Sequence, residues 1–321
     1  DAASEEGAGA DAEADQAAAA AAAEEIEPSS AVRDAALALR RAKAQGVGSH
    51  AIVSREDRAA ARALDELSAD VLRGVEAGEF EPFFQPQICA QTGSLVAFEA
   101  LARWRHPDRG VLAPGAFMEA AEKLGAIAEI DAQIFGKAIA QVKEWSANGQ
   151  YLPQLSLNVS TRRICSEEVC KQVFDAEFDE ATLCFELLES TFLDGGDAVI
   201  FDAIQRLRDL GTVFEVDDFG TGHASILSVM RIKPQRLKLA RELVESVATD
   251  AASQEMIRSI IDIAKSLEIG VNAEGIETDE QMSMLRELGC DVFQGYLIAK
   301  PMAAEDAAKF IRGGSAKAVP R

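Results

Sequence analysis

Histidines are few in this sequence, and paired cysteines are absent. The three histidines, His50, His106 and His223, include no two that are spaced as a metal-ligand pair. The five cysteines are odd in number and form no Cys-x-x-Cys motif, so we expect reduced thiols instead of disulfides or a zinc site. A metal site would therefore depend on oxygen ligands, which favours Mg²⁺ or Mn²⁺ over Zn²⁺.

Long apolar runs are also missing. No run approaches the roughly 18–20 residues that a membrane-spanning helix needs. The start has neither the basic nor the apolar region of a signal peptide, and it has no initiator Met, so we expect a fragment of a longer protein. We expect this segment to make no membrane contact. It would lie in the cytoplasm, or form the cytoplasmic part of a longer, membrane-attached protein.

Basic side chains are absent from residues 1–30, which hold nine acidic residues and an unbroken alanine run. Such a segment has too little apolar mass to bury, so we expect an acidic, Ala-rich disordered segment there. The full chain carries a formal net charge of −22. This charge disfavours nucleic acid as a partner, although a small anionic ligand can still bind where cations reverse the local field.

The rest of the chain divides by pattern into three parts. Residues 31–79 predict a helical linker, with helices over about 31–45 and 55–77. Residues 80–312 alternate short apolar runs with amphipathic helical patterns, and residues 313–321 form a short C-terminal tail. The hydrophobic content of 48% is enough for one large core in the middle part.

Eight strand candidates alternate with helical segments in that middle part, which predicts an α/β fold of the (β/α)8, TIM-like barrel type. The strands are expected at 80–85, 95–103, 155–158, 183–188, 213–217, 236–240, 270–273 and 292–295. The main helices are expected at 116–124, 131–147, 197–210, 253–267 and 280–288. Only residues 88–94 join the first two strands, which suits a hairpin and predicts a barrel that is irregular at its first strand.

Polar side chains stand at or near the carboxyl ends of seven of these strands. They are Glu99, Asn158, Glu186 with Glu189, Asp217 with Asp218, Lys238, Glu274 with Glu277, and Gln294. In a barrel these ends meet at one mouth, where active sites form. So many carboxylates repel one another unless cations lie among them, so we expect Asp217 and Asp218 to hold metal. The set has the composition of a two-metal phosphoester site, in which Lys238 positions the attacking water and Glu274 takes its proton.

Eight short motifs follow one another along the same part of the chain. They are FFQPQ (83–87), FEALARWRHP (98–107), LSLNVS (155–160), FELLES (185–190), VDDFGTG (216–222), LKL (237–239), NAEGIE (272–277) and CDVFQGYLIAKPM (290–302). Together they resemble the motifs of EAL domains, the cyclic di-GMP phosphodiesterases, over about residues 80 to 312. A weaker resemblance links residues 35–53 to the end of a GGDEF domain, the diguanylate cyclase fold; an unrelated linker helix is the alternative.

The resemblance to EAL domains implies an antiparallel first strand, two Mg²⁺ or Mn²⁺ ions, hydrolysis of cyclic di-GMP to linear pGpG, and a homodimer. It implies these metal ligands: Glu99, Asn158, Glu186, Asp217 and Asp218. It implies Lys238 and Glu274 as catalytic residues and Glu189 and Glu277 as supports of the site. The implied substrate contacts are Gln85, Leu101, Arg103 and Gln294.

The sequence departs from the family pattern at three positions. Ala240 stands where Asp is usual, His223 where Tyr is common, and Ala102 where Leu is usual. The alternative function is a catalytically weak or inactive cyclic di-GMP receptor or interaction module, but every ligand position is filled, which favours the enzyme. An upstream sensor or GGDEF domain in a longer parent chain is the other expected partner.

Overall fold

The computed structural model describes residues 52–189, 197–220 and 226–313, together with residues 32, 34–36, 38–39, 42–43 and 50. Several expected features lie outside the described residues. They are the disordered segment 1–30, most of the first linker helix and of the GGDEF-like stretch, His223, and residues 314–321 of the tail. By its internal contacts the chain divides into two units, residues 1–67 and residues 68–321. The first long helix, α3 (Arg55–Glu76), confirms the expected second linker helix and crosses this division.

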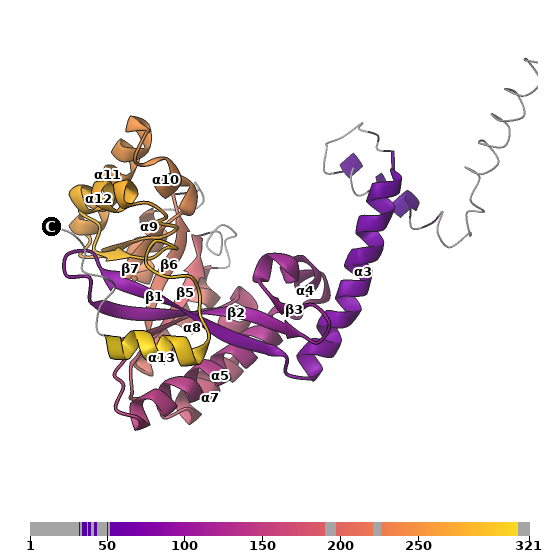
Figure 1. Ribbon diagram of the computed structural model, residues 1–321, viewed down its shortest axis with the longest axis horizontal. Helices are drawn as coiled ribbons and strands as arrows, with labels where there is room; N and C mark the ends of the chain where they lie inside the picture. Colours follow the sequence, from indigo (N-terminus) through magenta and orange to yellow (C-terminus); the bar gives the residue numbers. More distant parts are fainter. Residues whose placement is uncertain are drawn as a thin grey trace, which may run out of the picture. The chain divides into compact units, whose positions relative to one another are not determined.

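The second unit is a mixed α/β barrel of eight strands, TIM-like, with an antiparallel first strand (Figure 1). The barrel strands are β1 (Phe80–Cys89), β2 (Leu95–His106), β4 (Gln154–Asn158), β5 (Thr182–Leu188), β6 (Val213–Phe219), β7 (Arg236–Leu239), β8 (Gly270–Ala273) and β9 (Val292–Phe293). Six parallel pairings run from β2 to β9. Strand β1 then pairs antiparallel with both β2 and β9 and closes the barrel.

All eight expected strands are therefore present, and the expected irregularity at the first strand is confirmed. The structure adds β3 (Gly110–Leu112), which pairs antiparallel with the end of β2. Strand β2 is longer than expected and continues through His106 because this hairpin extends it. Strand β7 ends at Leu239, one residue earlier than expected. The buried Ala240 is the residue that precedes helix α10, and its backbone is still extended.

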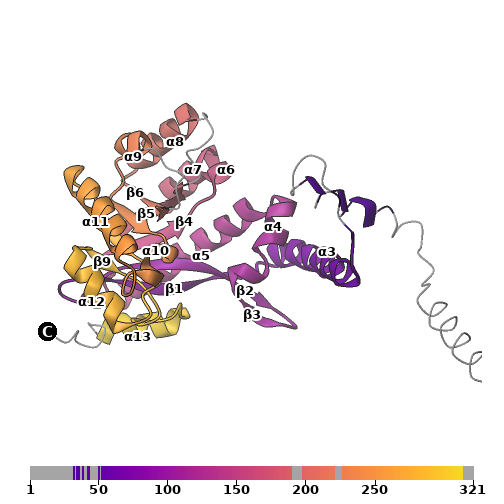
Figure 2. The ribbon, with the colours of Figure 1, turned by 90° about the horizontal axis from the view of Figure 1, so that it is seen from above.

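Twelve helical segments have both of their ends within the described residues, and several of them are too short to leave a periodic pattern in the sequence. Besides α3 they are η1 (Pro114–Ala116), α4 (Met118–Leu124), α5 (Ile127–Ala147), α6 (Thr161–Ile164), α7 (Glu167–Asp175), α8 (Asp197–Asp209), α9 (Ile226–Ile232), α10 (Arg241–Ser246), α11 (Ala251–Ser266), α12 (Asp279–Leu288) and α13 (Ala304–Gly313). Figure 2 shows α11 beside α12 and α7 beside α8, around the barrel. No described helix is long and apolar enough to span a membrane.

Alternation along β1 and β2 separates an aromatic outer face from a polar inner one. Phe84 on β1 lies 4.8 Å from Trp145 of α5, measured between ring centroids, and Phe98 on β2 lies 6.0 Å from Phe310 of α13. Their sequence neighbours Gln85 and Glu99 point the opposite way and are also buried. Helices α5 and α13 thus cover the outer face of β1 and β2, while the barrel interior receives polar side chains.

Gly295, just after β9, allows two backbone segments to touch. A Cβ atom at this position would lie 2.1 Å from the carbonyl oxygen of Ile276 and 2.3 Å from its amide nitrogen. The contact also brings the amide of Ile276 to the carbonyl of Gln294, at 3.1 Å. Because backbone atoms cannot rotate away as a side chain can, any larger residue must push the segments after β8 and β9 apart.

An overpacked site typically costs about 1–3 kcal/mol of stability. We therefore expect Gly295→Ala to lower the free energy of unfolding by an amount near the top of this range. Gly136→Ala is the matched control, because nothing lies within 4 Å of a Cβ atom at Gly136 in the middle of α5. It should stabilise the protein by about 0.5–1 kcal/mol. Urea unfolding of both variants measures these values, and a Gly295→Ala protein as stable as the parent would contradict the close contact.

Candidate active site

One buried ammonium group gathers the acidic side chains of the barrel mouth. Lys238 of β7 is completely buried, and its Nζ lies 2.5 Å from Glu186 Oε2, 2.7 Å from Glu274 Oε1, 3.2 Å from Asp217 Oδ1 and 3.7 Å from Glu99 Oε2. The four acids come from β5, from the residue after β8, from β6 and from β2. The structure therefore confirms that strand ends far apart in the sequence deliver their carboxylates to one place.

Amide side chains hold Glu99 from two sides. Asn158 Nδ2 donates to Glu99 Oε1 at 2.8 Å, and Gln294 Nε2 donates to Glu99 Oε2 at 2.6 Å. Gln294 also donates to Gln85 Oε1 at 3.1 Å and accepts from Gln87 Nε2 at 2.9 Å. These bonds connect β1, β2 and β4 with Gln294, the residue after β9, so the seam where the barrel closes is also one wall of the site.

The adjacent aspartates are separated by a change in backbone conformation. Asp218 has a φ of +54°, in the left-handed region that Asp tolerates better than most residues do. Its amide donates to Asp217 Oδ1 at 2.9 Å. Asp217 faces Lys238, while Asp218 is exposed at the rim of the mouth. The turn therefore places two like charges at one strand end without directing both at the same point.

Glu99, Glu186 and Glu274 have unequal proton affinities. Burial, followed by the nearby charge of Glu99, raises the pKa of Glu186 well above its usual value, and burial does the same for Glu274. Burial acts on Glu99 in the same direction, but Lys238 and the amide hydrogen bonds outweigh it and lower the pKa of Glu99. Burial would lower the pKa of Lys238, but Asp217, Glu186, Glu274 and Glu99 together raise it well above its usual value. The ammonium thus stays charged. Its single positive charge does not balance the negative charge of the surrounding acids.

The residues present fit divalent metal ions. Within the described part of the chain, no three acidic, cysteine or histidine side chains already form a metal coordination sphere, because the carboxylates converge on Lys238. However, Glu186 Oε1 is buried without a hydrogen-bond partner, and Glu274 Oε1 is close to Nζ without hydrogen-bond geometry. Mg²⁺ and Mn²⁺ require oxygen ligands and an excess of negative charge, and they can use buried carboxylate oxygens that no hydrogen bond occupies.

The other expected site residues surround this cluster at greater distances. Glu189 Oε2 accepts a hydrogen bond from the amide of Gly220, at 3.1 Å, in the segment that follows Asp218. Glu277 forms an exposed ion pair of 2.9 Å with Arg241. Arg103 lies over the ring of Phe83 and donates to the carbonyl of Ala102, at 2.7 Å, and Leu101 is the strand partner of Phe83. The structure thus places Arg103 and Leu101 on β2 beyond Glu99, whose charge still acts on the Arg103 guanidinium.

Three buried polar residues were missed by the sequence argument. They are Gln154, Glu215 and Arg236, which are joined by hydrogen bonds and an ion pair inside the barrel. Glu215 stands two residues before Asp217, and Arg236 two residues before Lys238. Residues two apart in a strand face the same side, so each of these pairs shares one face. This spacing was the signal by which the sequence could have identified Glu215 and Arg236 as inward-facing.

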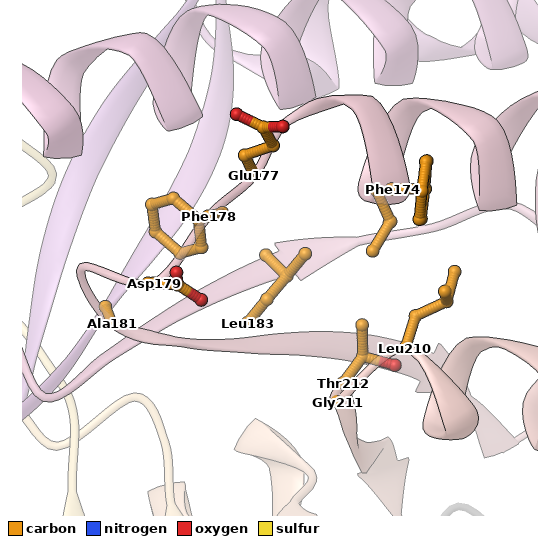
Figure 3. Close-up of a pocket in the computed structure, with 10 residues that line it drawn as sticks. Phe174, Glu177, Phe178, Asp179, Ala181, Leu183, Leu210, Gly211 and Thr212 are labelled. Atoms are coloured by element: carbon orange, nitrogen blue, oxygen red, sulfur yellow. The ribbon is translucent and has the colours of Figure 1, made fainter.

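A separate cavity of about 180 Å³ lies where the chain enters β5 and β6; Figure 3 shows the side chains that line it. Its lining includes Phe174 of α7, Phe178, Leu183 near the start of β5, and Thr212 just before β6. The mouth lies at the carboxyl ends of β5 and β6, so this cavity is outside the acid cluster.

The comparisons with known proteins agree with this arrangement. The family model of the EAL domain matches residues 68–301, and the chain therefore belongs to the EAL domain family. It is 35% identical over 244 residues to the oxygen sensor protein DosP of Escherichia coli, covering 75% of this chain and 30% of that protein. It is 34% identical over 238 residues to the cyclic di-GMP phosphodiesterase RocR of Pseudomonas aeruginosa, covering 73% and 60%.

Solved structures show the same fold. The structure described as a PaMucR phosphodiesterase in complex with c-di-GMP aligns with a TM-score of 0.70 at 30% identity, covering 75% of this chain and 99% of that one. The EAL enzyme Bd1971, in its cAMP- and cyclic-di-GMP-bound form, aligns with a TM-score of 0.72 at 28% identity, covering 78% and 70%. The chain spans only 30–60% of the length of the first three curated relatives that it matches.

The raised carboxyl pKa values predict how metal binding should change stability with pH. A carboxyl whose pKa is raised in the folded state stabilises the fold only while it is protonated, so its contribution is lost as the pH rises through the raised pKa. With a chelator present, the melting temperature should therefore fall between pH 6 and pH 8. Mn²⁺ should raise the melting temperature, and more at pH 8 than at pH 6, since protons then compete less with the ion.

Thermal melts with EDTA and with one fixed Mn²⁺ concentration, set at 100 times the Kd at pH 8, measure the difference at each pH. Saturation of that degree is worth about 2.7 kcal/mol, or about 5–10 °C for a domain of this size. Glu274→Gln, which removes one titrating carboxyl, should show a smaller pH dependence. Equal Mn²⁺ shifts at both pH values would contradict the assignment of raised pKa values to the metal-binding acids.

Proposed function

We propose that this chain hydrolyses cyclic di-GMP to linear pGpG with the help of two Mg²⁺ or Mn²⁺ ions. The observation that carries this proposal is the convergence of four carboxylates on Lys238 at the carboxyl ends of the barrel strands. Membership of the EAL domain family supports the reaction class. The relative named as a cyclic di-GMP phosphodiesterase and the related structure in complex with c-di-GMP support the substrate.

The proposed metal ligands are Glu99, Asn158, Glu186, Asp217 and Asp218. When bound, the ions would polarise the phosphoryl group and lower the pKa of a water molecule. Asn158 and Gln294 keep Glu99 oriented through their hydrogen bonds to its two oxygens. The exposed position of Asp218 at the rim suits a ligand at the edge of the site, beside the more buried Asp217.

Lys238 and Glu274 are the proposed catalytic residues. The ammonium of Lys238 would hold the attacking water by a hydrogen bond and stabilise negative charge on the phosphate. Glu274 would accept the proton of that water, and burial, which raises the pKa of its carboxyl group, makes it a stronger base. The two side chains lie 2.7 Å apart, so they can act on the same water molecule.

The proposed substrate contacts are Gln85, Leu101, Arg103 and Gln294, which lie on the β1, β2 and β9 side of the mouth. Arg103 would meet a phosphate or a guanine edge with its planar fork of donors. Glu189 would support the segment after Asp218 through its bond to Gly220, and Glu277 would support the position of the neighbouring Glu274. These assignments follow the matching family motifs.

We expect hydrolysis of cyclic di-GMP to pGpG in the presence of Mg²⁺ or Mn²⁺, with loss of turnover after chelation. Lys238→Ala should lower kcat by about 10²–10³-fold, as removal of one preorganised donor does, while cyclic di-GMP still binds. Lys309→Ala on α13 is the matched control, because its ammonium is exposed and pairs with Asp306 on the same helix. Chromatography of the products gives the rates, and circular dichroism checks folding. Tight binding by the metal-saturated parent without any product would establish the receptor alternative instead.

We also propose that the chain works as a homodimer through the exposed apolar face of α8 and α9. Ile226, Leu227 and Met230 on α9 are 48–68% exposed, and Val199 on α8, the helix against which α9 packs, is 60% exposed. Exposed apolar patches on soluble proteins mark sites of interaction with other proteins. Helix α9 follows Asp218 by only a few residues, so a contact there would lie close in the chain to Gly220, which Glu189 supports.

Leu227→Asp should therefore convert a dimer to a monomer in sedimentation velocity, since it places a charge in the centre of the patch. Tyr151→Asp, at a similarly exposed site on the loop before β4, should leave the dimer intact. A parent protein that sediments as a monomer at micromolar concentration would contradict this proposal.

A further inference from the structure

A second layer of charge lies inside the barrel beneath the acid cluster. Glu215 of β6 is completely buried, and Oε1 of its carboxylate lies 3.0 Å from Arg236 Nε and accepts a hydrogen bond from Gln154 Nε2 at 2.8 Å. Arg236 Nη2 donates to Gln154 Oε1 at 2.9 Å, and Gln154 also donates to Ser156 Oγ at 3.0 Å. We call these four residues the floor network; none of them belongs to the proposed metal or substrate set.

The register of the strands connects the floor network to the catalytic layer. Glu215 is the strand partner of Glu186 on one side and of Arg236 on the other. Glu186 in turn holds the Lys238 ammonium at 2.5 Å. The chain of neighbours therefore runs from Arg236 to Glu215, then to Glu186 and to Lys238.

Arg236 is the cation that compensates Glu215. Among the described residues of the barrel strands, Arg236 and Lys238 are the two buried cationic side chains, and they stand two residues apart on β7. Glu215 Oε2 has no hydrogen-bond partner in the described structure, so Glu215 depends on the contacts of its other oxygen. Without Arg236, this buried carboxylate would repel its neighbour Glu186 and attract the nearest remaining cation, the Lys238 ammonium.

We propose that Arg236 is a positioning residue, which neutralises Glu215 so that Glu186 and Lys238 keep the arrangement that the reaction uses. The guanidinium never touches the substrate or the reacting atoms. Its effect reaches them through the charge of Glu215 and the position of Glu186. The effect on turnover rests on the proposed function, whereas the effect on Lys238 does not.

Three variants separate this role from ordinary structural support. Arg236→Met removes the cation and leaves Glu215 uncompensated. The double variant Glu215→Met with Arg236→Met removes both charges, a replacement that buried ion pairs often tolerate. Arg163→Met is the matched control, because Arg163 on α6 is also a buried arginine, and its neighbours Gln172 on α7 and the Phe135 ring on α5 lie outside the barrel.

Two measurements are made on each folded variant, besides its melting temperature. The first is the ¹⁵N NMR signal of the Lys238 ammonium, assigned by its loss in Lys238→Met. The second is kcat and KM with cyclic di-GMP in saturating Mn²⁺. In Arg236→Met we expect a displaced ammonium signal and a kcat lower by about 10–10²-fold, the cost of a misplaced catalytic group, with KM changed by less than about twofold. The double variant should recover both the signal and kcat, and Arg163→Met should lose melting temperature only.

The inference is wrong if Arg236→Met lowers the melting temperature but leaves the ammonium signal and kcat of the folded protein at parental values. It is also wrong if the double variant fails to recover them, because uncompensated Glu215 would then not be the cause. If Arg236→Met does not fold, Arg236→Gln replaces it, since it removes the charge and keeps a donor for Gln154. A parent that hydrolyses nothing while the signal moves and recovers would refute the proposed function and leave the positioning role supported.

Discussion

The Lys238 ammonium is the interaction on which the architecture of the mouth depends. It is a fully buried cation with four carboxylates within 4 Å, contributed by segments that lie up to 175 residues apart between Glu99 and Glu274. A buried ion is costly to desolvate, and only good compensation by surrounding charges makes its burial tolerable. The strands must therefore be correctly paired before this group can be buried, and this requirement ties formation of the barrel to assembly of the site.

The way the barrel closes serves the same site. Strand β1 runs antiparallel to both of its neighbours. Its Gln85 and Gln87 therefore lie on a strand whose chain direction is opposite to that of the parallel strands. Their amides meet Gln294, the residue after β9, which holds Glu99 of β2. A hydrogen-bonded amide can satisfy a buried carboxylate without adding charge, and the seam thus orients a metal-ligand candidate without reducing its negative charge.

The barrel interior is polar at two levels, whereas TIM-like barrels are usually filled by branched apolar residues. The lower level pairs Glu215 with Arg236, and the upper level surrounds Lys238 with acids. On β6 and β7 the same strand supplies both levels from alternate positions. The lower level is balanced in charge and the upper one is not, which concentrates the excess negative charge where divalent ions are expected.

Most of the fold could be predicted from the sequence, because the patterns that indicate helices and strands are local. Alternating apolar runs and helical periods located all eight barrel strands and α3, α5, α8, α11 and α12 to within a few residues. Short helices such as α6 and α10 escaped, because four to six residues cannot display a helical period. Strand β3 escaped as well, since three residues of a hairpin become a strand only by pairing with β2.

The sequence by itself also determined which residues stand at the strand ends, and hence that Glu99, Glu186, Asp217, Lys238 and Glu274 would meet. Only the tertiary structure decided that these carboxylates converge on Lys238, and that Gln154, Glu215 and Arg236 form a second network below them. The physical reason is the stagger of strands in a closed barrel. Alternation tells which side chains face inward, but the register between strands sets which of them lie at the same height. That register arises from pairings between segments that are remote in the chain.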